Sequence, residues 1–372
     1  MNTTIMQALE TTLESSKQNS FGSENFDRRR FGQPRASTHN LSTFQRLKIL
    51  WNRSVGEKTS PGVAFRKAPT ILPHADRFQR LFDSLQRQED RELLVSLLAY
   101  RELGYEKVRL SRNTPDYWQQ IALAESLVDQ KDTYDPHFMN FMLSRFDLRP
   151  IGIDIQLYFA AIGITTTFLL EQYSYKKSVP TPIQVEPGNV VLDLGGCWGD
   201  TALYFANKTG TGGKVYSFEF IPGNVLLFKI NLNLNPDLQS IIQLVEQPVA
   251  NISNHTIYFQ DQGPSSKIVS HPFIGHSGST QTISIDDFVK ENKIDRIDFI
   301  KMDIEGAELG ALQGAIETLR RFRPNLAIAI YHSLGDMCQI PNWILDLNLG
   351  YEIFLDHFTI HSEETVCFAR AC

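Results

Sequence analysis

The sequence predicts an α/β protein with a doubly wound, mostly parallel sheet, preceded by a helical subdomain. Short runs of branched apolar residues, such as Val190 to Leu192 and Leu326 to Ile330, are typical of parallel strands buried on both faces. Segments with apolar residues at helical spacing alternate with these runs from residue 183 onward. Residues 71–182 show mainly helical spacing. These observations predict helices packed on both faces of one sheet.

The composition is that of an ordinary soluble globular protein, with 42% hydrophobic and 21% charged residues among 372. The net charge of −6 gives no reason to expect a nucleic-acid partner. No apolar run of about 18 residues predicts a membrane span, and the N-terminus lacks the apolar core of a signal peptide. Four cysteines lack zinc or redox spacing, which suits a reducing cytosol, so we expect a cytoplasmic protein.

Residues 1–70 are expected to form a basic, largely disordered N-terminal arm. They hold 11 Lys and Arg against 5 Asp and Glu, and residues 1–40 are rich in Ser, Thr, Asn and Gln. Within this arm, residues 41–53 mix apolar and basic side chains and predict a short amphipathic helix. This helix would either contact a membrane surface or partner, or pack on the acidic body of the protein.

Residues 71–182 are predicted to form a helical subdomain that covers the ligand edge of the sheet. Apolar stripes at Phe78 to Leu85 and Leu93 to Leu98 support helices there. The Pro-rich segment 179–182 is expected to link this subdomain to a catalytic domain over residues 183–372.

A glycine turn directly follows the first predicted strand of that domain. The pattern is D-x-G-x-x-x-G, and its members are Asp193, Gly195, Gly196 and Gly199. Glycines let a ligand approach the backbone closely at the carboxyl edge of a sheet. A carboxylate in such a turn suits a cationic amino-acid group better than a pyrophosphate, which favours S-adenosyl-L-methionine as the ligand.

The next predicted strand, Lys214 to Phe218, ends in Glu219. A carboxylate there can accept hydrogen bonds from both ribose hydroxyls of a nucleoside ligand. Glu246 and Gln247 follow the third strand and would flank adenine. A nicotinamide-nucleotide site is the alternative, although the glycines do not follow G-x-G-x-x-G.

After Glu219 the strands and helices continue to alternate. Pro222 is expected to open a helix, Ile241 to Val245 to form a strand, and residues 254–285 to form a β-rich insertion. Residues 297–302 form the next strand and Leu309 to Leu319 a helix, which Pro324 ends. Tyr351 to Leu355 and Thr365 to Ala369 predict a final antiparallel hairpin.

Three ionisable residues follow predicted strands at the ligand edge, namely Asp303, His332 and His357. Each is a candidate catalytic base that would face an acceptor hydroxyl. Asp303 with Glu305 could instead hold a divalent cation such as Mg²⁺. Helix capping is the structural alternative for the two acids, and a satisfied buried position is the alternative for the two histidines. Lys301 lies inside a buried strand, so we expect its charge to pair with a carboxylate.

The chain resembles the FkbM-type methyltransferases over about residues 165–370. The resemblance lies in the run from Asp193 to Ala206, in the block K-M-D-I-E-G-A-E at 301–308 and in R-P-N-L-A at 323–327. Tyr331-His332, Asp356-His357 and Glu364 to Val366 are similar to one branch of that family. The resemblance implies a seven-stranded Rossmann-like methyltransferase sheet. It also implies methyl transfer from S-adenosyl-L-methionine to an oxygen, often on a sugar, glycolipid or other secondary metabolite.

Two functions of other classes stay open from the sequence. The first is a nicotinamide-dependent oxidoreductase on the same kind of sheet. The second is a non-catalytic binding protein that uses the basic arm for partner contact. Fold alone does not separate these functions, because such sheets host many activities.

Overall fold

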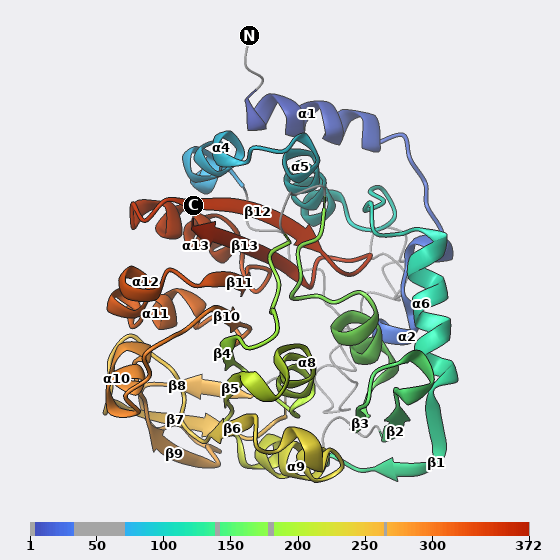
Figure 1. Ribbon diagram of the computed structural model, residues 1–372. Helices are drawn as coiled ribbons and strands as arrows, with labels where there is room; N and C mark the ends of the chain where they lie inside the picture. Colours follow the sequence, from blue (N-terminus) through green and yellow to red (C-terminus); the bar gives the residue numbers. More distant parts are fainter. Residues whose placement is uncertain (1–3, 33–70, 138–141, 178–181, 264–265, 372) are drawn as a thin grey trace.

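The computed structural model describes residues 4–32, 71–137, 142–177, 182–263 and 266–371. Its centre is a seven-stranded sheet in the order β12-β13-β11-β10-β4-β5-β6 (Figure 1). The strands are β4 (Val190–Leu194), β5 (Lys214–Phe218), β6 (Ile242–Val245), β10 (Phe299–Met302), β11 (Asn325–Ala329), β12 (Tyr351–His357) and β13 (Thr365–Ala371). β11, β10, β4, β5 and β6 pair in parallel, whereas β13 is antiparallel to both β11 and β12. The fold is therefore α/β with a mixed sheet, and the predicted final hairpin is confirmed.

Alternate side chains of the central strands enter two different hydrophobic cores. Leu192 and Leu194 point into the core of the α10–α13 face, whereas Val191 points into the core of the α8 face. This alternation follows from the two-residue period of a strand. The covering helices are α8 (Asp200–Thr209), α9 (Pro222–Asn233), α10 (Ile285–Glu291), α11 (Glu308–Gln313), α12 (Ile316–Phe322) and α13 (Leu334–Asp346). A strand buried on both faces explains why its sequence is uniformly apolar.

The helices begin where the sequence supplies caps. The Ser284 hydroxyl accepts the Asp287 N–H before α10, and the Ser333 hydroxyl accepts the Asp336 N–H before α13. α9 begins with Pro222, whose missing N–H costs nothing in a first turn. Residues 254–285 add a small sheet in the order β8-β7-β9, as the sequence predicted. Its strands are β7 (Thr256–Gln260), β8 (Lys267–Val269) and β9 (Gly278–Gln281).

The N-terminal residues 4–32 are folded onto the body, which corrects the expectation of a largely disordered arm for this stretch. α1 (Ile5–Ser16) has a capping box between Thr4 and Gln7, and it buries Ile5 and Leu9. The Asn25 amide donates to the backbone oxygens of Tyr105 (2.6 Å) and Val108 (2.9 Å), which fixes the chain before α2 (Arg28–Phe31). Polar composition misled the prediction because these few anchors suffice to order the chain. The amphipathic helix predicted at 41–53 lies outside the described residues.

Residues 71–182 are only partly helical. The helices are α4 (Ala75–Ser84), α5 (Gln88–Leu103), α6 (Pro115–Ser126), the short α7 (Ala161–Gly163) and the π-helix η5 (Ile164–Leu169). The segment 128–159 instead forms an antiparallel sheet of β1 (Val128–Tyr134), β2 (Leu143–Asp147) and β3 (Gln156–Phe159). This corrects the prediction of a mainly helical subdomain. The sheet forms here because its strands pair in sequence and because Leu143, Phe146 and Leu157 join hydrophobic cores that also contain Leu227 and Phe228 of α9.

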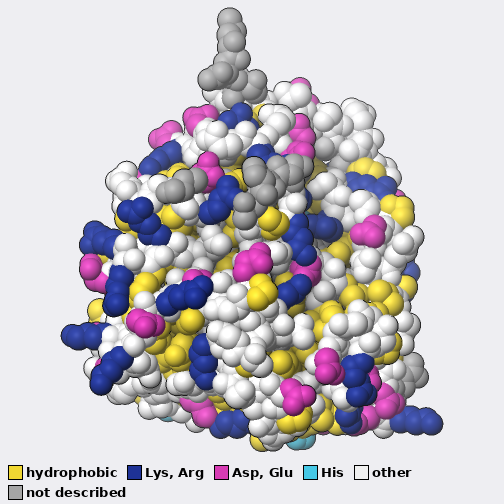
Figure 2. Space-filling model, in the orientation of Figure 1, with side chains coloured by type: hydrophobic (Ala, Val, Ile, Leu, Met, Phe, Trp, Pro, Cys, Tyr) yellow, Lys and Arg dark blue, Asp and Glu magenta, His cyan; other side chains and the backbone are white. Residues whose placement is uncertain are grey.

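Helices α1, α4 and α5 lie at the β12 edge of the main sheet, and α8, α9 and the small β1–β3 sheet lie on the face opposite α10–α13 (Figure 1). Short 3₁₀ turns connect several elements: η1 (Ser23–Asn25), η3 (Leu72–His74), η4 (Arg149–Ile151), η6 (Gly210–Gly212) and η7 (Pro236–Leu238). Lys and Arg side chains lie among Asp and Glu side chains on the face shown in Figure 2. None of the described helices is long and apolar enough to cross a membrane.

Candidate active site

The turn between β4 and α8 is held from inside by the Asp193 carboxylate. Asp193 is fully buried and accepts hydrogen bonds from the hydroxyls of Thr201 (3.0 and 2.9 Å) and Ser217 (2.7 Å). All of these hydrogen bonds come from other buried residues of the protein. The sequence placed Asp193 against the cofactor, and the structure corrects this: Asp193 positions the turn and has no exposed surface for a ligand.

The buried Lys301 on β10 completes this arrangement. Its Nζ lies 3.2 Å from Asp193 Oδ1 and donates to the backbone oxygens of Leu194 (3.2 Å) and Gly195 (2.7 Å). Burial would lower the pKa of Lys301, but Asp193, and then Asp303 and Asp200, hold it above its ordinary value. The predicted pairing of Lys301 with a carboxylate is confirmed. This ammonium group therefore fixes the direction of the carbonyls in the turn.

The turn glycines are required by close backbone approach. A Cβ atom on Gly195, whose φ is +85°, would lie 1.9 Å from the backbone oxygen of Asp303. A Cβ atom on Gly196 would lie 2.1 Å from the Ser217 hydroxyl oxygen. Gly199, with φ of +88°, caps the start of α8. The three glycines keep the turn narrow and pack it directly against the end of β10.

Glu219 lies at the carboxyl end of β5, beside this turn. Its Oε1 accepts the N–H groups of Phe220 (2.7 Å) and Ile221 (2.8 Å), and its Oε2 accepts the Asn224 amide (3.1 Å). Burial raises the pKa of Glu219 to about 7, against these hydrogen bonds, which favour the charged form. A carboxyl group with this many fixed donors is held rigidly in one orientation.

The loop after β6 adjoins Glu219, since the Glu219 N–H donates to the Val245 backbone oxygen (3.2 Å). Within that loop the Glu246 side chain is exposed and pairs with Lys229 of α9 at 2.5 Å. Gln247 is half-buried. The structure thus places Glu246 and Gln247 at the same sheet edge as Glu219, as the sequence predicted, and directs the Glu246 carboxylate toward α9.

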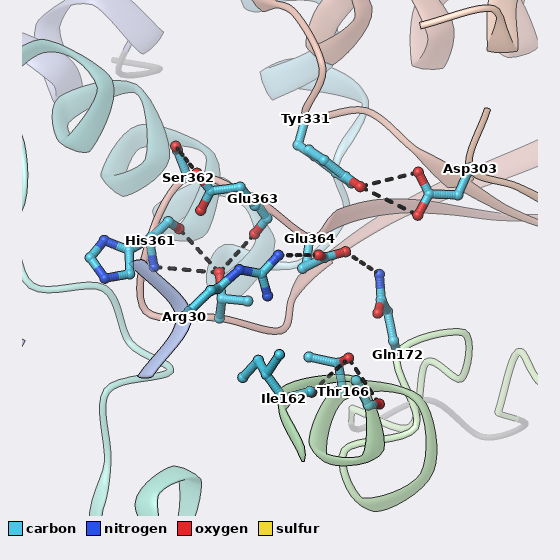
Figure 3. Close-up of polar contacts among 12 residues, drawn as sticks. Arg30, Ile162, Thr166, Gln172, Asp303, Tyr331, His361, Ser362, Glu363 and Glu364 are labelled. Atoms are coloured by element: carbon cyan, nitrogen blue, oxygen red, sulfur yellow. Dashed lines mark hydrogen bonds and ion pairs between the residues drawn. The ribbon is translucent and has the colours of Figure 1, made fainter. Parts of the chain in front are cut away.

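Asp303 follows β10 and forms the centre of a polar cluster. Its carboxylate accepts hydrogen bonds from the hydroxyls of Tyr173 (3.0 Å) and Tyr331 (3.1 Å), and the latter contact is drawn in Figure 3. The Nε2 atom of His332 lies 3.4 Å from Asp303 Oδ1. Burial would raise the pKa of Asp303, yet His332 and Lys301 hold it below its ordinary value. The two predicted residues Asp303 and His332 are therefore brought together.

Two more carboxylates surround the His332 ring. Its Nε2 lies 3.7 Å from Glu305 Oε2, and its Nδ1 lies 3.3 Å from Glu308 Oε1. Burial opposes protonation of His332, but Asp303, followed by Glu308 and Glu305, raises its pKa to about 9. Burial and the neighbouring Asp303 raise the pKa of Glu305 to about 7. The cluster thus concentrates negative charge around a single imidazole ring.

The opposite side of the cluster is formed by residues far apart in the sequence. Glu364, in the turn after β12, pairs with Arg30 of α2 and accepts a hydrogen bond from the Gln172 amide (2.7 Å). Figure 3 shows Arg30 and Gln172 reaching Glu364 from two sides, with Tyr331 and Asp303 beyond it. Glu364 has a left-handed backbone with φ of 63°. The N-terminal segment therefore contributes a charged side chain next to the candidate site.

His357 is not part of this cluster in the structure. It is buried on β12, its Nδ1 is 2.9 Å from the Thr365 hydroxyl, and burial, followed by Arg112, lowers its pKa to about 3. A buried neutral imidazole of this kind supports the sheet, which corrects the prediction that His357 faces an acceptor. The nearby His361 accepts the Asp27 N–H (2.9 Å) and anchors the N-terminal segment.

Several residues of the site were not singled out by the sequence. They are Arg30, Tyr173, Asp200, Glu308, Tyr331 and Glu364. Asp200, in the first turn of α8, accepts a hydrogen bond from Thr167 of the π-helix (3.0 Å), and burial raises its pKa to about 6. Glu308 and Tyr331 lie in motifs that were quoted for the family resemblance, so the motifs held a usable signal. Arg30 had none, because its partner is 334 residues away.

Comparisons with known proteins agree with this geometry. A sequence model of the methyltransferase FkbM domain matches residues 181–353. The crystal structure of methyltransferase FkbM from Methylobacillus flagellatus KT aligns with a TM-score of 0.51 and 18% identity, over 88% of this chain and 71% of that one. This likeness shows a shared fold. No curated protein matched the chain.

Two other solved structures overlap less closely. Aeropyrum pernix fibrillarin, in complex with natively bound S-adenosyl-L-methionine, gives a TM-score of 0.34 at 15% identity, over 62% of this chain and 89% of that one. A putative O-methyltransferase from Klebsiella pneumoniae gives 0.32 at 9% identity, over 69% and 90%. Residues 181–353 match the methyltransferase FkbM domain, as the motifs indicated, so this part of the chain is an FkbM-type methyltransferase domain.

Proposed function

We propose that the protein is an O-methyltransferase that moves a methyl group from S-adenosyl-L-methionine to a hydroxyl of a sugar, glycolipid or other secondary metabolite. The observation that carries this proposal is the contact between the glycine turn and the Asp303 cluster. Gly195 packs against the Asp303 backbone so closely that no side chain fits between them. A ligand seated on the turn would therefore have the Asp303 cluster beside it.

The residues at the turn fit the cofactor. Gly195 and Gly196 pack the turn tightly against Asp303 and Ser217, so no side chain covers the backbone there, and Gly199 begins α8 beside it. The buried Glu219 carboxyl is oriented to accept ribose hydroxyls, and the loop of Glu246 and Gln247 would flank adenine. Asp200 would hold the ammonium group of the methionine end, a role that the sequence gave to Asp193. Bound S-adenosyl-L-methionine supplies a methyl group on a positively charged sulfur.

Asp303 and His332 would face the acceptor hydroxyl. Tyr173 and Tyr331 hold the Asp303 carboxylate in one orientation through their hydroxyl groups, and the carboxylate is therefore placed to take the hydroxyl proton. A positioned proton acceptor contributes roughly 10²–10⁴-fold to such a reaction. Alignment of the acceptor contributes on the order of 7–11 kcal/mol in favourable cases.

A polyhydroxylated acceptor is supported by the side chains around the cluster. Gln172, Glu364 and Arg30 supply hydrogen-bond donors and acceptors on one side, and Tyr331 lies between them and Asp303 (Figure 3). Sugars are recognised by such dense polar groups because each hydroxyl both donates and accepts. A cytoplasmic location is part of the proposal, supported by the unpaired state of the described cysteines Cys197, Cys338 and Cys367.

Calorimetric titration with S-adenosylhomocysteine, beside NADH, tests the cofactor. We expect micromolar binding of the first and none of the second, and we expect Glu219→Ala to weaken binding while Glu317→Ala on exposed α12 leaves it unchanged. A screen of hydroxylated acceptors with a labelled methyl donor then tests the reaction. His332→Ala should lower turnover and keep cofactor binding. Cofactor binding without turnover on any hydroxyl acceptor would favour a non-catalytic binding protein.

A further inference from the structure

We propose that Asp303, Glu308 and His332 form a binding site for one divalent transition-metal ion. One potential ligand atom from each of the three residues lies within 4.8 Å of the other two. The residues come from the end of β10, the start of α11 and the end of β11, which converge at one point of the sheet edge. The sequence expected Asp303 with Glu305, and the structure replaces Glu305 by Glu308 and adds a nitrogen ligand.

Some buried polar atoms of this set lack hydrogen-bond partners. Neither nitrogen of His332 makes a hydrogen bond, although the side chain is only 10% exposed. Glu308 is fully buried, and its Oε2 atom has no hydrogen-bond partner either. Buried polar atoms are nearly always paired in native proteins, so atoms left unpaired at one point call for a ligand. An imidazole offers only one nitrogen to a given ion, so one His332 nitrogen and Glu308 Oε2 are the unpaired atoms that such an ion would bind, an observation independent of the acidic charge.

The spacing of the groups also fits an ion. His332 Nε2 and Asp303 Oδ1 are 3.4 Å apart, which is longer than an ordinary hydrogen bond. Two ligand atoms that each lie about 2.1 Å from one ion, at tetrahedral to octahedral angles, are roughly 3.0–3.4 Å apart. The Nε2–Oδ1 separation is therefore the one expected when both atoms share an ion.

Both carboxylates are positioned by contacts other than His332. Glu308 Oε1 accepts the backbone N–H groups of Ile304 (2.8 Å) and Gly306 (3.3 Å), which leaves Oε2 free. This turn requires left-handed backbone at Glu305 (φ 57°) and at Gly306 (φ 95°). Asp303 is held by the hydroxyls of Tyr173 and Tyr331, as described above. Such fixed outer contacts are typical of metal ligands, whose orientation they set.

The ligand set selects the class of ion. Mg²⁺ and Ca²⁺ prefer oxygen ligands alone, whereas an imidazole nitrogen with two carboxylates suits Mn²⁺, Fe²⁺ or Zn²⁺. Three protein ligands leave coordination positions open for a substrate oxygen. In a role that rests on the proposed methyl transfer, the ion would bind the acceptor hydroxyl and lower its pKa, which assists loss of the proton.

Titration of chelator-treated full-length protein with Mn²⁺ alone, followed by calorimetry and electron paramagnetic resonance, tests the site. We expect one ion per chain. Glu308→Gln should weaken binding at least about 10-fold, whereas Glu305→Gln, outside the ligand set, should change it less than about 3-fold. Absence of stoichiometric binding would overturn the proposal, and so would equal losses in the two variants.

Two further measurements test the metal site without a variant and separate the metal proposal from the methyltransferase proposal. Mn²⁺ should broaden the imidazole resonances of His332 in the unmodified protein beyond those of buried His357, and this requires no variant to fold. Titration with S-adenosylhomocysteine in the same samples separates the two proposals. Cofactor binding without Mn²⁺ binding would overturn the metal-site proposal alone. Mn²⁺ binding without cofactor binding would overturn the methyltransferase proposal alone.

Discussion

The backbone oxygen of Asp303 lies directly against the Cα atom of Gly195, at a distance that leaves no room for a Cβ atom. The Asp303 N–H also donates to the Leu194 backbone oxygen (3.0 Å). The end of β10 and the turn after β4 are therefore joined backbone to backbone. A shift of the turn would therefore move the Asp303 carboxylate with it, and under the proposed function this would couple cofactor binding to acceptor binding.

Gly195→Ala should disrupt this junction. The new Cβ would lie 1.9 Å from the Asp303 backbone oxygen at a φ of +85°, and we expect a loss of more than about 2 kcal/mol in the free energy of unfolding. S-adenosylhomocysteine affinity should fall with it. Gly310→Ala in α11 is the matched control, since its Cβ meets nothing within 4 Å. Thermal unfolding and calorimetry measure both effects, and equal behaviour of the two variants would contradict the prediction.

Lys301→Met should destabilise the protein strongly. It leaves the fully buried Asp193 carboxylate without its cation, which costs about 3–5 kcal/mol. The double variant with Asp193→Asn should lose less than the sum of the two single changes, because the buried charge is then gone as well. Lys229→Met removes an exposed pair with Glu246 and should cost under about 1 kcal/mol. Denaturant unfolding of the parent, the single variants Lys301→Met and Asp193→Asn, the double variant and Lys229→Met checks this, and strict additivity would argue against the pairing.

Tyr331→Phe and Tyr173→Phe should lower turnover without unfolding the protein. Each removes one hydrogen bond to the Asp303 carboxylate, an interaction with a charged group worth about 1.5–3 kcal/mol. The carboxylate then loses its fixed orientation toward the acceptor. Tyr105→Phe, whose hydroxyl contacts the exposed side of Glu106, is the control. Steady-state kinetics with the identified acceptor would refute the assignment if all three variants matched the parent.

Arg30→Gln should weaken acceptor binding more than cofactor binding. The Arg30–Glu364 pair is mostly buried, with side chains 19% and 14% exposed, so its loss leaves Glu364 free to move beside Tyr331. We expect KM for the acceptor to rise several-fold and S-adenosylhomocysteine affinity to stay the same. The neighbouring Arg29 pairs with Glu125 at the exposed surface, and Arg29→Gln should have little effect. If Arg30→Gln and Arg29→Gln raised the KM for the acceptor equally, the N-terminal segment would act only through the stability of the fold.

Cofactor affinity should rise with pH because of Glu219. Its pKa is raised to about 7 by burial, so the carboxyl group becomes a charged acceptor for ribose hydroxyls only as the pH passes through that value. Without cofactor the sign for stability is opposite. The folded protein holds the Glu219 proton more tightly than the unfolded chain, so this group's contribution to the free energy of unfolding falls as pH rises from about 4.5 to about 7.

Glu219→Gln tests both signs, since it removes the titration and keeps the shape of the side chain. Calorimetry from pH 6 to 8 should show rising S-adenosylhomocysteine affinity in the parent and a flatter profile in the variant. Chemical unfolding from about pH 4.5 to about pH 7 should show the parent losing stability relative to the variant. A parent profile as flat as that of Glu219→Gln would refute the role of this carboxyl group.

Local patterns in the sequence predicted the catalytic domain well. The apolar runs located the strands at 190–194, 299–302 and 325–329, because strands buried on both faces admit few polar residues. The glycines of the turn and the buried position of Lys301 could also be inferred, since each follows from its own neighbours in the chain. The strands of segment 128–159 differ from the prediction because they are short, carry no long alternating pattern, and bury their apolar side chains against distant parts of the chain.

By itself, the sequence determined the order of strands and helices after residue 183, the FkbM-type motifs of residues 181–353, and the sheet edge at which polar residues gather. Only the tertiary structure decided which of those residues meet. In the structure, His332 lies beside Asp303 and Glu308, whereas His357 lies outside this cluster. The Asp193 side chain is buried inside the turn. Arg30 contacts Glu364, which is 334 positions away in the chain. The physical reason is that secondary structure follows from residues a few positions apart, whereas a site depends on side-chain contacts between elements, whose distances no local pattern records.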